Sequence, residues 1–278
     1  MRGHLVAETN SEQNGTVLIG AHVRDQEPLG AAAETASGVI QIFVGDPQSW
    51  KPPTPRPDSE RIRTSGIPVY VHSPYVVNLA SDNNKIRLPS RKILQATCDA
   101  ATLIGALGVV VHGGHVGNNG DVSEGVDRWR KALDELQTEM PILLENTAGG
   151  ERAMARYWDD IARLWDVIGN DPRMKFCLDT CHTHASGEQL ADSVDKVRAI
   201  TGRIDLLHCN GSRDSEGSGR DRHQNFSLLG TDNSVSPKML VDIVASANAP
   251  VICETPAEGL ASDVSFLRSY VPGADPLT

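Results

Sequence analysis

Residues 108–112 read Gly-Val-Val-Val-His, and residues 141–145 read Pro-Ile-Leu-Leu-Glu. Each stretch is an apolar run of strand length that ends on a side chain able to bind a metal ion. Six further runs have the same character: Val17–His22, Val39–Val44, Ile67–His72, Met174–Asp179, Ile204–His208 and Pro250–Glu254. All of these except Val39–Val44 end in His, Glu or Asp. Eight segments of this kind predict eight buried strands.

Stretches with helical character separate the eight runs. They are Pro28–Ser37, Pro57–Ser65, Ser90–Ala106, Ser123–Glu139, Glu151–Ile168, Glu188–Gly202, Ser236–Ala247 and Leu260–Tyr270. Ser90 is a residue type that commonly caps the start of a helix. The alternation of strand and helix predicts a parallel sheet closed into an eight-stranded (β/α)8 TIM barrel. We expect one catalytic domain over residues 17–278, preceded by a disordered polar tail over residues 1–16.

The composition fits a soluble globular domain. Of the 278 residues, 39% are hydrophobic and 22% are charged, and no apolar run is long enough to cross a bilayer. The five cysteines are an odd number, and no secretory signal precedes them, which indicates reduced thiols. We therefore expect a protein of the cytoplasm, with no membrane partner.

The formal net charge of −10 argues against a general nucleic-acid binder, because such proteins usually carry a basic surface. Bound metal would change this balance locally. Three divalent ions would outweigh the charges of Glu145, Asp179, Asp221 and Glu254, and the charge of the ions has to be counted at such a site. An anionic substrate is therefore compatible with the acidic composition.

The polar strand ends predict a metal site. A TIM barrel gathers the carboxyl ends of its strands at one mouth, where its active site lies. The residues that would meet there are His72, His112, Glu145, Asp179, His208 and Glu254. Histidine and carboxylate ligands suit zinc or a similar divalent ion. His22 also ends a strand, and we expect it to form hydrogen bonds near this site.

A long segment follows the seventh run. Residues 210–235 are rich in Gly and Ser, and a connection of this length in a compact domain is usually functional. The segment contains Arg220-Asp221-Arg222-His223. Asp221 and His223 could form a third, separate metal site together with His182. Arg220 and Arg222 would either contact phosphate or be solvated, and the sequence leaves both readings open.

Several motifs in the chain resemble the endonuclease IV family. They are Ile-Gly-Ala-His-Val (19–23), Asp-Pro-Gln-Ser-Trp (46–50), Val-Asn-Leu-Ala-Ser (77–81), Leu-Glu-Asn-Thr-Ala-Gly (144–149), Cys-Leu-Asp-Thr-Cys-His (177–182), Asp-Arg-His (221–223) and Cys-Glu-Thr (253–255). The motifs occur in the family's order, and the similarity extends over nearly the whole chain.

The resemblance implies a zinc-dependent DNA-repair endonuclease that cleaves the phosphodiester bond 5′ to abasic sites in double-stranded DNA and also removes blocks from 3′ ends. It implies three Zn²⁺ ions, one or more of which Mn²⁺ or another divalent ion could replace. The implied ligands are His72, His112 and Glu145 for the first ion, Glu145, Asp179, His208 and Glu254 for the second, and His182, Asp221 and His223 for the third. Glu145 is the expected catalytic residue, because it would bridge two ions and help to position the attacking water.

The resemblance also implies that side chains enter the DNA at the lesion. Tyr75 occupies a matching position, and Gln48 stands where some members of the family have Arg. His22, Arg220 and Arg222 complete the expected substrate-binding set. We expect a monomer, which fits a protein that must surround a bent duplex.

Two alternatives stay open at this point. A metal-dependent isomerase acting on a sugar or hydroxy acid would hold two metal ions with Glu145, Asp179, His208 and Glu254, but it has no evident need for a third ion beside Asp221. A catalytically weak DNA-lesion-binding protein is suggested by Phe226–Gly230, where the family usually has a Gly-Glu-Gly turn.

Overall fold

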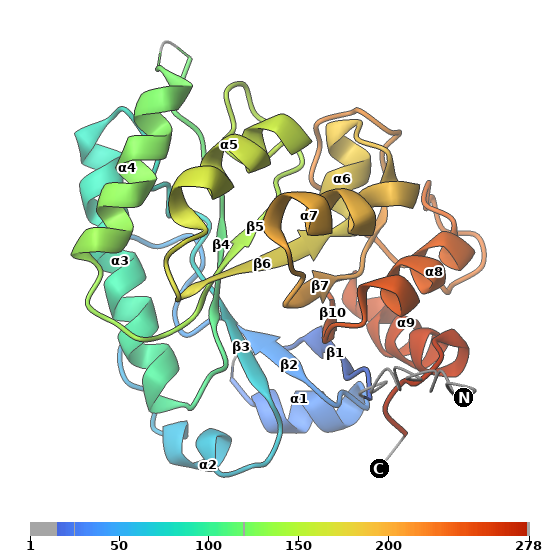
Figure 1. Cartoon of the computed structure of the whole chain (residues 1–278). Helices are drawn as coiled ribbons and strands as arrows, with labels where there is room; N and C mark the ends of the chain where they lie inside the picture. The colour runs from blue at the N-terminus through green and yellow to red at the C-terminus, as the bar shows by residue number, and fades with distance from the viewer. Residues whose placement is uncertain (1–15, 25, 119, 277–278) are drawn as a thin grey trace, which may run out of the picture.

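The computed structural model describes residues 16–24, 26–118 and 120–276. Its barrel strands are parallel and close in the order β1-β10-β7-β6-β5-β4-β3-β2, with helices around the outside (Figure 1). The predicted single-domain (β/α)8 TIM barrel is confirmed. The predicted tail over residues 1–16 lies outside the described residues, apart from Thr16.

Each barrel strand lies inside one of the eight apolar runs. The strands are β1 (Ile19–His22), β2 (Ile40–Ile42), β3 (Val69–His72), β4 (Val109–His112), β5 (Ile142–Glu145), β6 (Met174–Asp179), β7 (Leu206–His208) and β10 (Val251–Cys253). Val, Ile and Leu are common in them, as expected of strands that are buried on both faces. Apart from β2, every strand ends on the predicted polar residue or, in β10, directly before it.

The helices are α1 (Pro28–Glu34), α2 (Ser59–Arg63), α3 (Asn84–Leu103), α4 (Val122–Glu135), α5 (Trp158–Ile168), α6 (Thr180–Ser186), α7 (Ser193–Thr201), α8 (Pro237–Ala247) and α9 (Ala257–Tyr270), with a 3₁₀ turn at Leu190–Asp192. The expected cap at Ser90 is wrong, because α3 begins at Asn84 and the Asn83 side chain accepts a hydrogen bond from Lys85 N. None of the helices in the described residues is long and apolar enough to span a membrane.

Two sets of buried apolar residues lie on either side of the barrel wall. The larger set packs the helices against the strands, and a smaller set consists of Val39, Tyr70, Val110, Leu143, Cys177, Leu206 and Ile252. Successive strand residues point to opposite faces, so residues two positions apart share a face. The residues two positions beyond the smaller set are Gln41, His72, His112, Glu145, Asp179, His208 and Glu254. The smaller set is therefore an apolar floor beneath a polar layer at the mouth.

The connection between β7 and α8 contains a small sheet of its own. β8 (Gly211–Ser212) pairs antiparallel with β9 (His223–Gln224). His223 Nδ1 donates a hydrogen bond to the carbonyl oxygen of Glu254 at 3.1 Å, which holds β9 against the end of β10. The long segment therefore returns to the mouth of the barrel.

Candidate metal centre

Strand register brings the first predicted ligands together. β4 and β5 pair with His112 opposite Glu145, and β6 and β7 pair with Asp179 opposite His208. Helix α6 begins directly after β6, and Asp179 Oδ1 accepts a hydrogen bond from His182 N at 2.6 Å. The ligands predicted from the sequence thus approach one another at the mouth from strands, from one helix and from the long connection.

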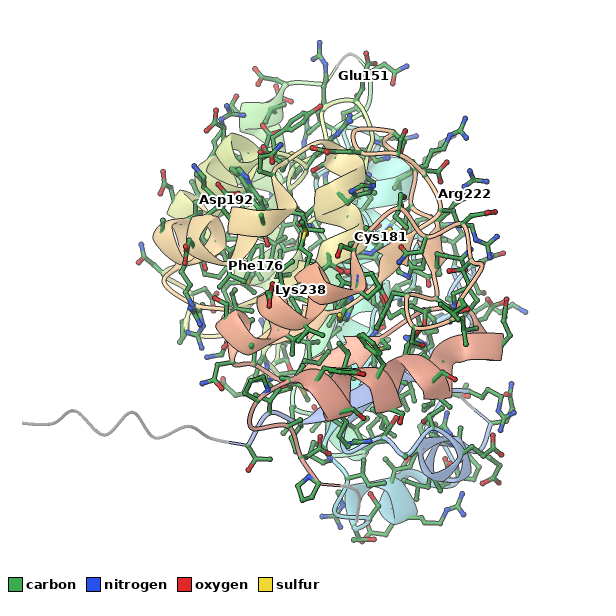
Figure 2. The ribbon with its side chains drawn as sticks, turned by 90° about the vertical axis from the view of Figure 1, so that its right-hand side faces the viewer. Glu151, Phe176, Cys181, Asp192, Arg222 and Lys238 are labelled. Atoms are coloured by element: carbon green, nitrogen blue, oxygen red, sulfur yellow. The ribbon has the colours of Figure 1, made fainter. Side chains whose placement is uncertain are left out.

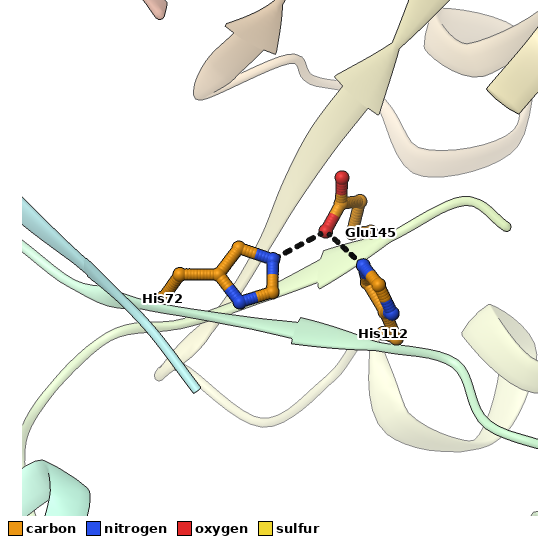
Figure 3. Close-up of side chains that lie close together, drawn as sticks. All are labelled: His72, His112 and Glu145. Atoms are coloured by element: carbon orange, nitrogen blue, oxygen red, sulfur yellow. Dashed lines mark hydrogen bonds and ion pairs between the residues drawn. The ribbon is translucent and has the colours of Figure 1, made fainter. Parts of the chain in front are cut away.

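Glu145 lies between two groups of histidines and is fully buried. Its Oε2 atom lies 3.1 Å from His72 Nε2 and 3.0 Å from His112 Nε2 (Figure 3). Its Oε1 atom instead lies 2.8 Å from His208 Nδ1. The two oxygens face different partners, and a carboxylate placed in this way is able to bridge two cations.

A second cluster adjoins the first through Glu145. The ligand atoms of Glu145, Asp179, His208 and Glu254 all lie within 4.8 Å of one another, a spacing that one ion could span. His208 Nδ1 lies 3.2 Å from Glu254 Oε2 and 3.9 Å from Asp179 Oδ2. Because three of the four side chains are carboxylates, the cluster has an excess of negative charge.

Asp221 links the remaining predicted ligands. Its Oδ2 atom lies 3.1 Å from His182 Nε2, and its Oδ1 atom lies 3.1 Å from His223 Nε2. His223 Nε2 is also 3.9 Å from Asp179 Oδ2, so this third cluster reaches the second. Cys181 lies close to Asp221 and His223, but burial raises the pKa of its thiol to about 12, which keeps the thiol protonated near neutral pH.

Burial and charge oppose each other in this centre. Burial raises the pKa of Glu145, but His112 and His208 more than offset this effect, and the pKa lies well below its ordinary value. Burial lowers the pKa of His182, but neighbouring carboxylates raise it well above the ordinary value. The pKa of His223 rises against burial in the same way, to about 9. A cluster that holds protons this strongly has a negative potential, which also attracts metal cations.

The ring orientations fit metal binding. His72, His182 and His223 donate their Nδ1 hydrogens to backbone carbonyl oxygens at 2.7, 2.8 and 3.1 Å. Their Nε2 atoms therefore face the carboxylates. Within the part of the chain that the structure describes, His182 Nε2 and His223 Nε2 are buried without a hydrogen-bond partner, even though Asp221 is 3.1 Å from each. One nitrogen anchored by the protein and the other directed at the centre is the usual arrangement of metal-binding histidines.

The residues expected to bind substrate lie around the mouth. His22 Nδ1 lies 3.3 Å from Glu254 Oε1. The Tyr75 side chain is 56% exposed, and Gln48 is exposed as well. Tyr75 N donates a hydrogen bond to the carbonyl oxygen of the residue before Gln48 at 2.9 Å, so the loops that carry these two side chains are joined.

A cavity of about 440 Å³ opens beside the centre. Tyr75 and Trp50 line it together with His112, His182 and Asp221. Both aromatic side chains are partly exposed, so the cavity combines apolar surface with the polar groups of the centre. A ligand could therefore reach the predicted metal ligands from this side.

The arginines that flank Asp221 are paired within the protein. Arg222 lies against Asp214 with Nη2 2.5 Å from Oδ1, and its Nε donates a hydrogen bond to Oδ2 at 2.7 Å. Arg220 Nη1 lies 3.5 Å from Asp214 Oδ1. Figure 2 shows Arg222 near the surface and Cys181 further inside. Asp214 thus holds the segment that carries Asp221, while both guanidinium groups remain more than half exposed.

The sequence did not point to three buried amides that contact predicted ligands. Gln41 Nε2 donates a hydrogen bond to Glu254 Oε1 at 2.6 Å. Asn210 Nδ2 donates to Asp179 Oδ2 at 2.7 Å, and Asn146 Oδ1 accepts a hydrogen bond from Asp179 N at 2.7 Å. The two asparagines each stand within two residues of a predicted ligand, and this proximity was the available signal. Gln41 had no such neighbour in the sequence.

The segment Phe226–Gly230, where the chain departs from the family pattern, is anchored by Asp263 of α9. The Asp263 carboxylate is fully buried. It accepts hydrogen bonds from Asn225 Nδ2, Phe226 N, Ser227 N, Ser227 Oγ and Thr255 Oγ1. Because Thr255 directly follows Glu254, the same carboxylate joins this segment to the end of β10. The altered segment is therefore fixed to the strand that leads into the centre.

Asp263→Asn should lower the free energy of unfolding by about 2–3 kcal/mol, because one buried acceptor oxygen becomes an NH₂ group that faces other donors. Urea denaturation measures this change. Asp242→Asn, at an exposed position of α8, is the matched control and should change stability by less than about 0.5 kcal/mol. Equal stabilities of the two variants would contradict the anchoring role of Asp263.

Comparison with known proteins identifies the family. The sequence family described as Xylose isomerase-like TIM barrel matches residues 29–270. A protein named Probable endonuclease 4 from Mycobacterium ulcerans is 60% identical over 252 residues, which cover 91% of this chain and 98% of that protein. The chain belongs to the endonuclease IV family.

Solved structures extend the comparison. The endonuclease IV of Thermus thermophilus superimposes with a TM-score of 0.75 at 26% identity, covering 91% of this chain and 98% of that one. A D-tagatose 3-epimerase-like protein superimposes with a TM-score of 0.71 at 16% identity, covering 87% of this chain and 91% of that one. The epimerase likeness shows a shared fold alone, whereas the likeness to endonuclease IV proteins extends through the sequence.

Proposed function

We propose that this chain is a metal-dependent DNA-repair endonuclease that hydrolyses the phosphodiester bond 5′ to abasic sites and also removes blocking groups from 3′ ends. The observation that carries the proposal is the position of Glu145, whose two oxygens face different histidines. Paired cations held by one carboxylate suit phosphodiester hydrolysis. The endonuclease names of relatives at 60% identity support the same reaction.

The proposed cofactors are three Zn²⁺ ions, with Mn²⁺ or another divalent ion possible at one or more sites. We assign the ligands in three sets: His72, His112 and Glu145, then Glu145, Asp179, His208 and Glu254, then His182, Asp221 and His223. The assignment is supported by the short distances within each set and by the buried, unpartnered Nε2 atoms of His182 and His223. Imidazole nitrogen and carboxylate oxygen are ligands that suit zinc.

Bound divalent ions would lower the pKa of a bound water, and their positive charge would offset the negative charge of the phosphate. Glu145 would keep the first two sites at a fixed separation and orient the attacking water. Asp221 would hold the third site on the long connection, next to the cavity where a phosphate can enter. The apolar floor would limit the access of water to the centre from below. Electrostatic interactions in the centre would then be stronger, because less water screens them.

The proposed partner is double-stranded DNA with an abasic site or a blocked 3′ end, bound by a monomer in the cytoplasm. An abasic nucleotide has lost its stacking, so turning it out of the helix costs less. Tyr75 and Gln48 lie exposed on joined loops and would contact the duplex beside the lesion. Arg220 and Arg222 would contact phosphates with the exposed parts of their side chains. His22 would form hydrogen bonds at the edge of the centre.

The isomerase alternative is disfavoured by two observations. Asp221, His182 and His223 form a third cluster for which a two-metal isomerase has no evident need. The epimerase-like structure shares only 16% identity with this chain, whereas an endonuclease 4 shares 60%. The weak lesion binder is disfavoured because Asp263 anchors the altered segment and the nine proposed ligands still lie close to one another.

The test is nicking of a labelled duplex that contains one abasic site, without added metal and then with added zinc. We expect incision 5′ to the lesion that leaves a 3′-hydroxyl, and no incision of an undamaged duplex of the same sequence. No incision in saturating zinc would reject the proposed function. Sugar turnover in the same preparation would favour the isomerase, and tight binding without cutting would favour the lesion binder.

A further inference from the structure

Gln41 is a fully buried polar side chain on β2, the strand that ends without a predicted ligand. It lies two residues beyond Val39 of the apolar floor, so it points into the polar layer. β2 pairs with β1 and β3, yet the Gln41 side chain also contacts Glu254, directly after β10, and His208 of β7. It therefore reaches across the mouth as well as contacting His22 of the neighbouring strand β1.

The contacts of Gln41 fix which way its amide points. Its Nε2 lies 2.6 Å from Glu254 Oε1, and an ionised carboxylate can only accept a hydrogen bond, so the NH₂ group faces Glu254. A second Nε2 hydrogen is available to His22 Nδ1 at 3.0 Å. The amide oxygen must then face the other way, where it lies 2.9 Å from His208 Nε2.

This orientation decides the hydrogen position on His208. An amide oxygen can only accept, so His208 Nε2 donates and carries the hydrogen. The lone pair of neutral His208 is then on Nδ1, which lies 2.8 Å from Glu145 Oε1 and 3.2 Å from Glu254 Oε2. His208 therefore presents Nδ1 to the second cluster, whereas His72 and His182 present Nε2.

The anchor of His208 also differs in kind from the other anchors. His72, His182 and His223 donate to backbone carbonyl oxygens, which remain whatever side chain the anchoring residue has. His208 donates to a side chain, so a single substitution can remove its anchor. The same substitution also removes a hydrogen bond to Glu254, a second proposed ligand of the same ion.

We infer that Gln41 is a positioning residue that holds His208 with Nδ1 directed at the second metal site and, with the same amide, holds the Glu254 carboxylate beside it. The inference rests on the proposed function, since it concerns the ligands of that site. Partners that orient metal ligands in this way typically change metal affinity by about 10–100-fold when they are removed.

The test compares zinc-loaded wild type with Gln41→Met, which keeps the length of the side chain and removes both polar atoms. Zinc affinity and the rate of zinc loss to a chelator are measured, together with the downfield ¹H–¹⁵N resonance of the His208 Nε2–H group. Gln137→Met, at an exposed position after α4, is the matched control. Gln41→Glu keeps an oxygen toward His208 and guards against a failure of Gln41→Met to fold.

We expect Gln41→Met to bind its weakest zinc ion about 10–100-fold less tightly and to lose or broaden the His208 resonance. Gln137→Met should match the wild type, and Gln41→Glu should keep the resonance. Wild-type zinc affinity and an unchanged resonance in Gln41→Met would overturn the inference while the proposed function stands. A wild-type protein that binds no zinc would overturn both.

Discussion

Glu145→Gln should reduce incision at abasic sites by at least about 10³-fold while the barrel stays folded. The wild-type carboxylate directs one oxygen at His72 and His112 and the other at His208. Glutamine has the same shape but offers one acceptor oxygen, and its NH₂ group would face the second set of ligands as a donor. The bridge between the two proposed sites would be lost, and with it the paired charge that hydrolysis of a phosphodiester requires.

Single-turnover cleavage of an abasic duplex measures this effect, and zinc content and thermal unfolding show whether the variant is intact. Glu151→Gln is the matched control, because Glu151 lies exposed in the loop that follows β5. That variant should cleave at the wild-type rate. Cleavage by Glu145→Gln within about tenfold of the wild type would exclude Glu145 as the bridging and catalytic residue.

Asp221→Asn should release one of the three proposed ions and lower cleavage by about 10²-fold or more. Asp221 contacts both His182 and His223 at 3.1 Å, and it is the carboxylate that the long connection brings to this cluster. An asparagine cannot provide negative charge to either histidine or to a cation. The first two sites should keep their ions, because Asp221 belongs to neither of their proposed ligand sets.

Zinc per chain, measured after gel filtration by elemental analysis, should fall by one relative to the wild type. Asp232→Asn, an exposed aspartate of the same connection, should leave both zinc content and cleavage unchanged. A full complement of zinc in Asp221→Asn would show that the third site is made by other residues. Cys181 would then be the first to examine, since its sulfur is within reach of His223.

The barrel and the six predicted ligands at or beside strand ends follow from one physical constraint on the sequence. A buried strand must be apolar, so the residue at which polarity begins marks the end of the strand. In β3, β4, β5, β6 and β7 that residue is also a predicted ligand. Because the carboxyl ends of parallel strands lie at the same mouth, predicting the strand ends also predicts that these side chains lie close together.

Two features were not predicted from the sequence: the role of Gln41 and the start of α3. Gln41 is the one polar residue in the run Val39–Val44, and β2 ends at Ile42. Such an inward-facing amide can be predicted only by assigning each residue of the strand in turn to one face or the other. In α3, the expected start at Ser90 is wrong because Asn83 already caps the helix about two turns earlier.

The sequence could not predict the contacts that hold the long connection, for a different reason. Asp214 and Asp263 hold the long connection through ion pairs and hydrogen bonds to residues that no local pattern links to them. Such contacts depend on how the connection folds over the mouth. Periodicity in the sequence predicts helices and strands, whereas these two carboxylates contact residues of an irregular connection.

The apolar floor would also govern how ions at the proposed sites are exchanged. Val110, Leu143, Leu206 and Ile252 close the barrel beneath the polar layer, so a hydrated ion or a chelator has its route through the mouth. A DNA duplex bound there would cover the same route. The enzyme would then keep its ions for as long as it stays on DNA, and a shortage of zinc would inactivate idle molecules before it affected those already engaged in repair.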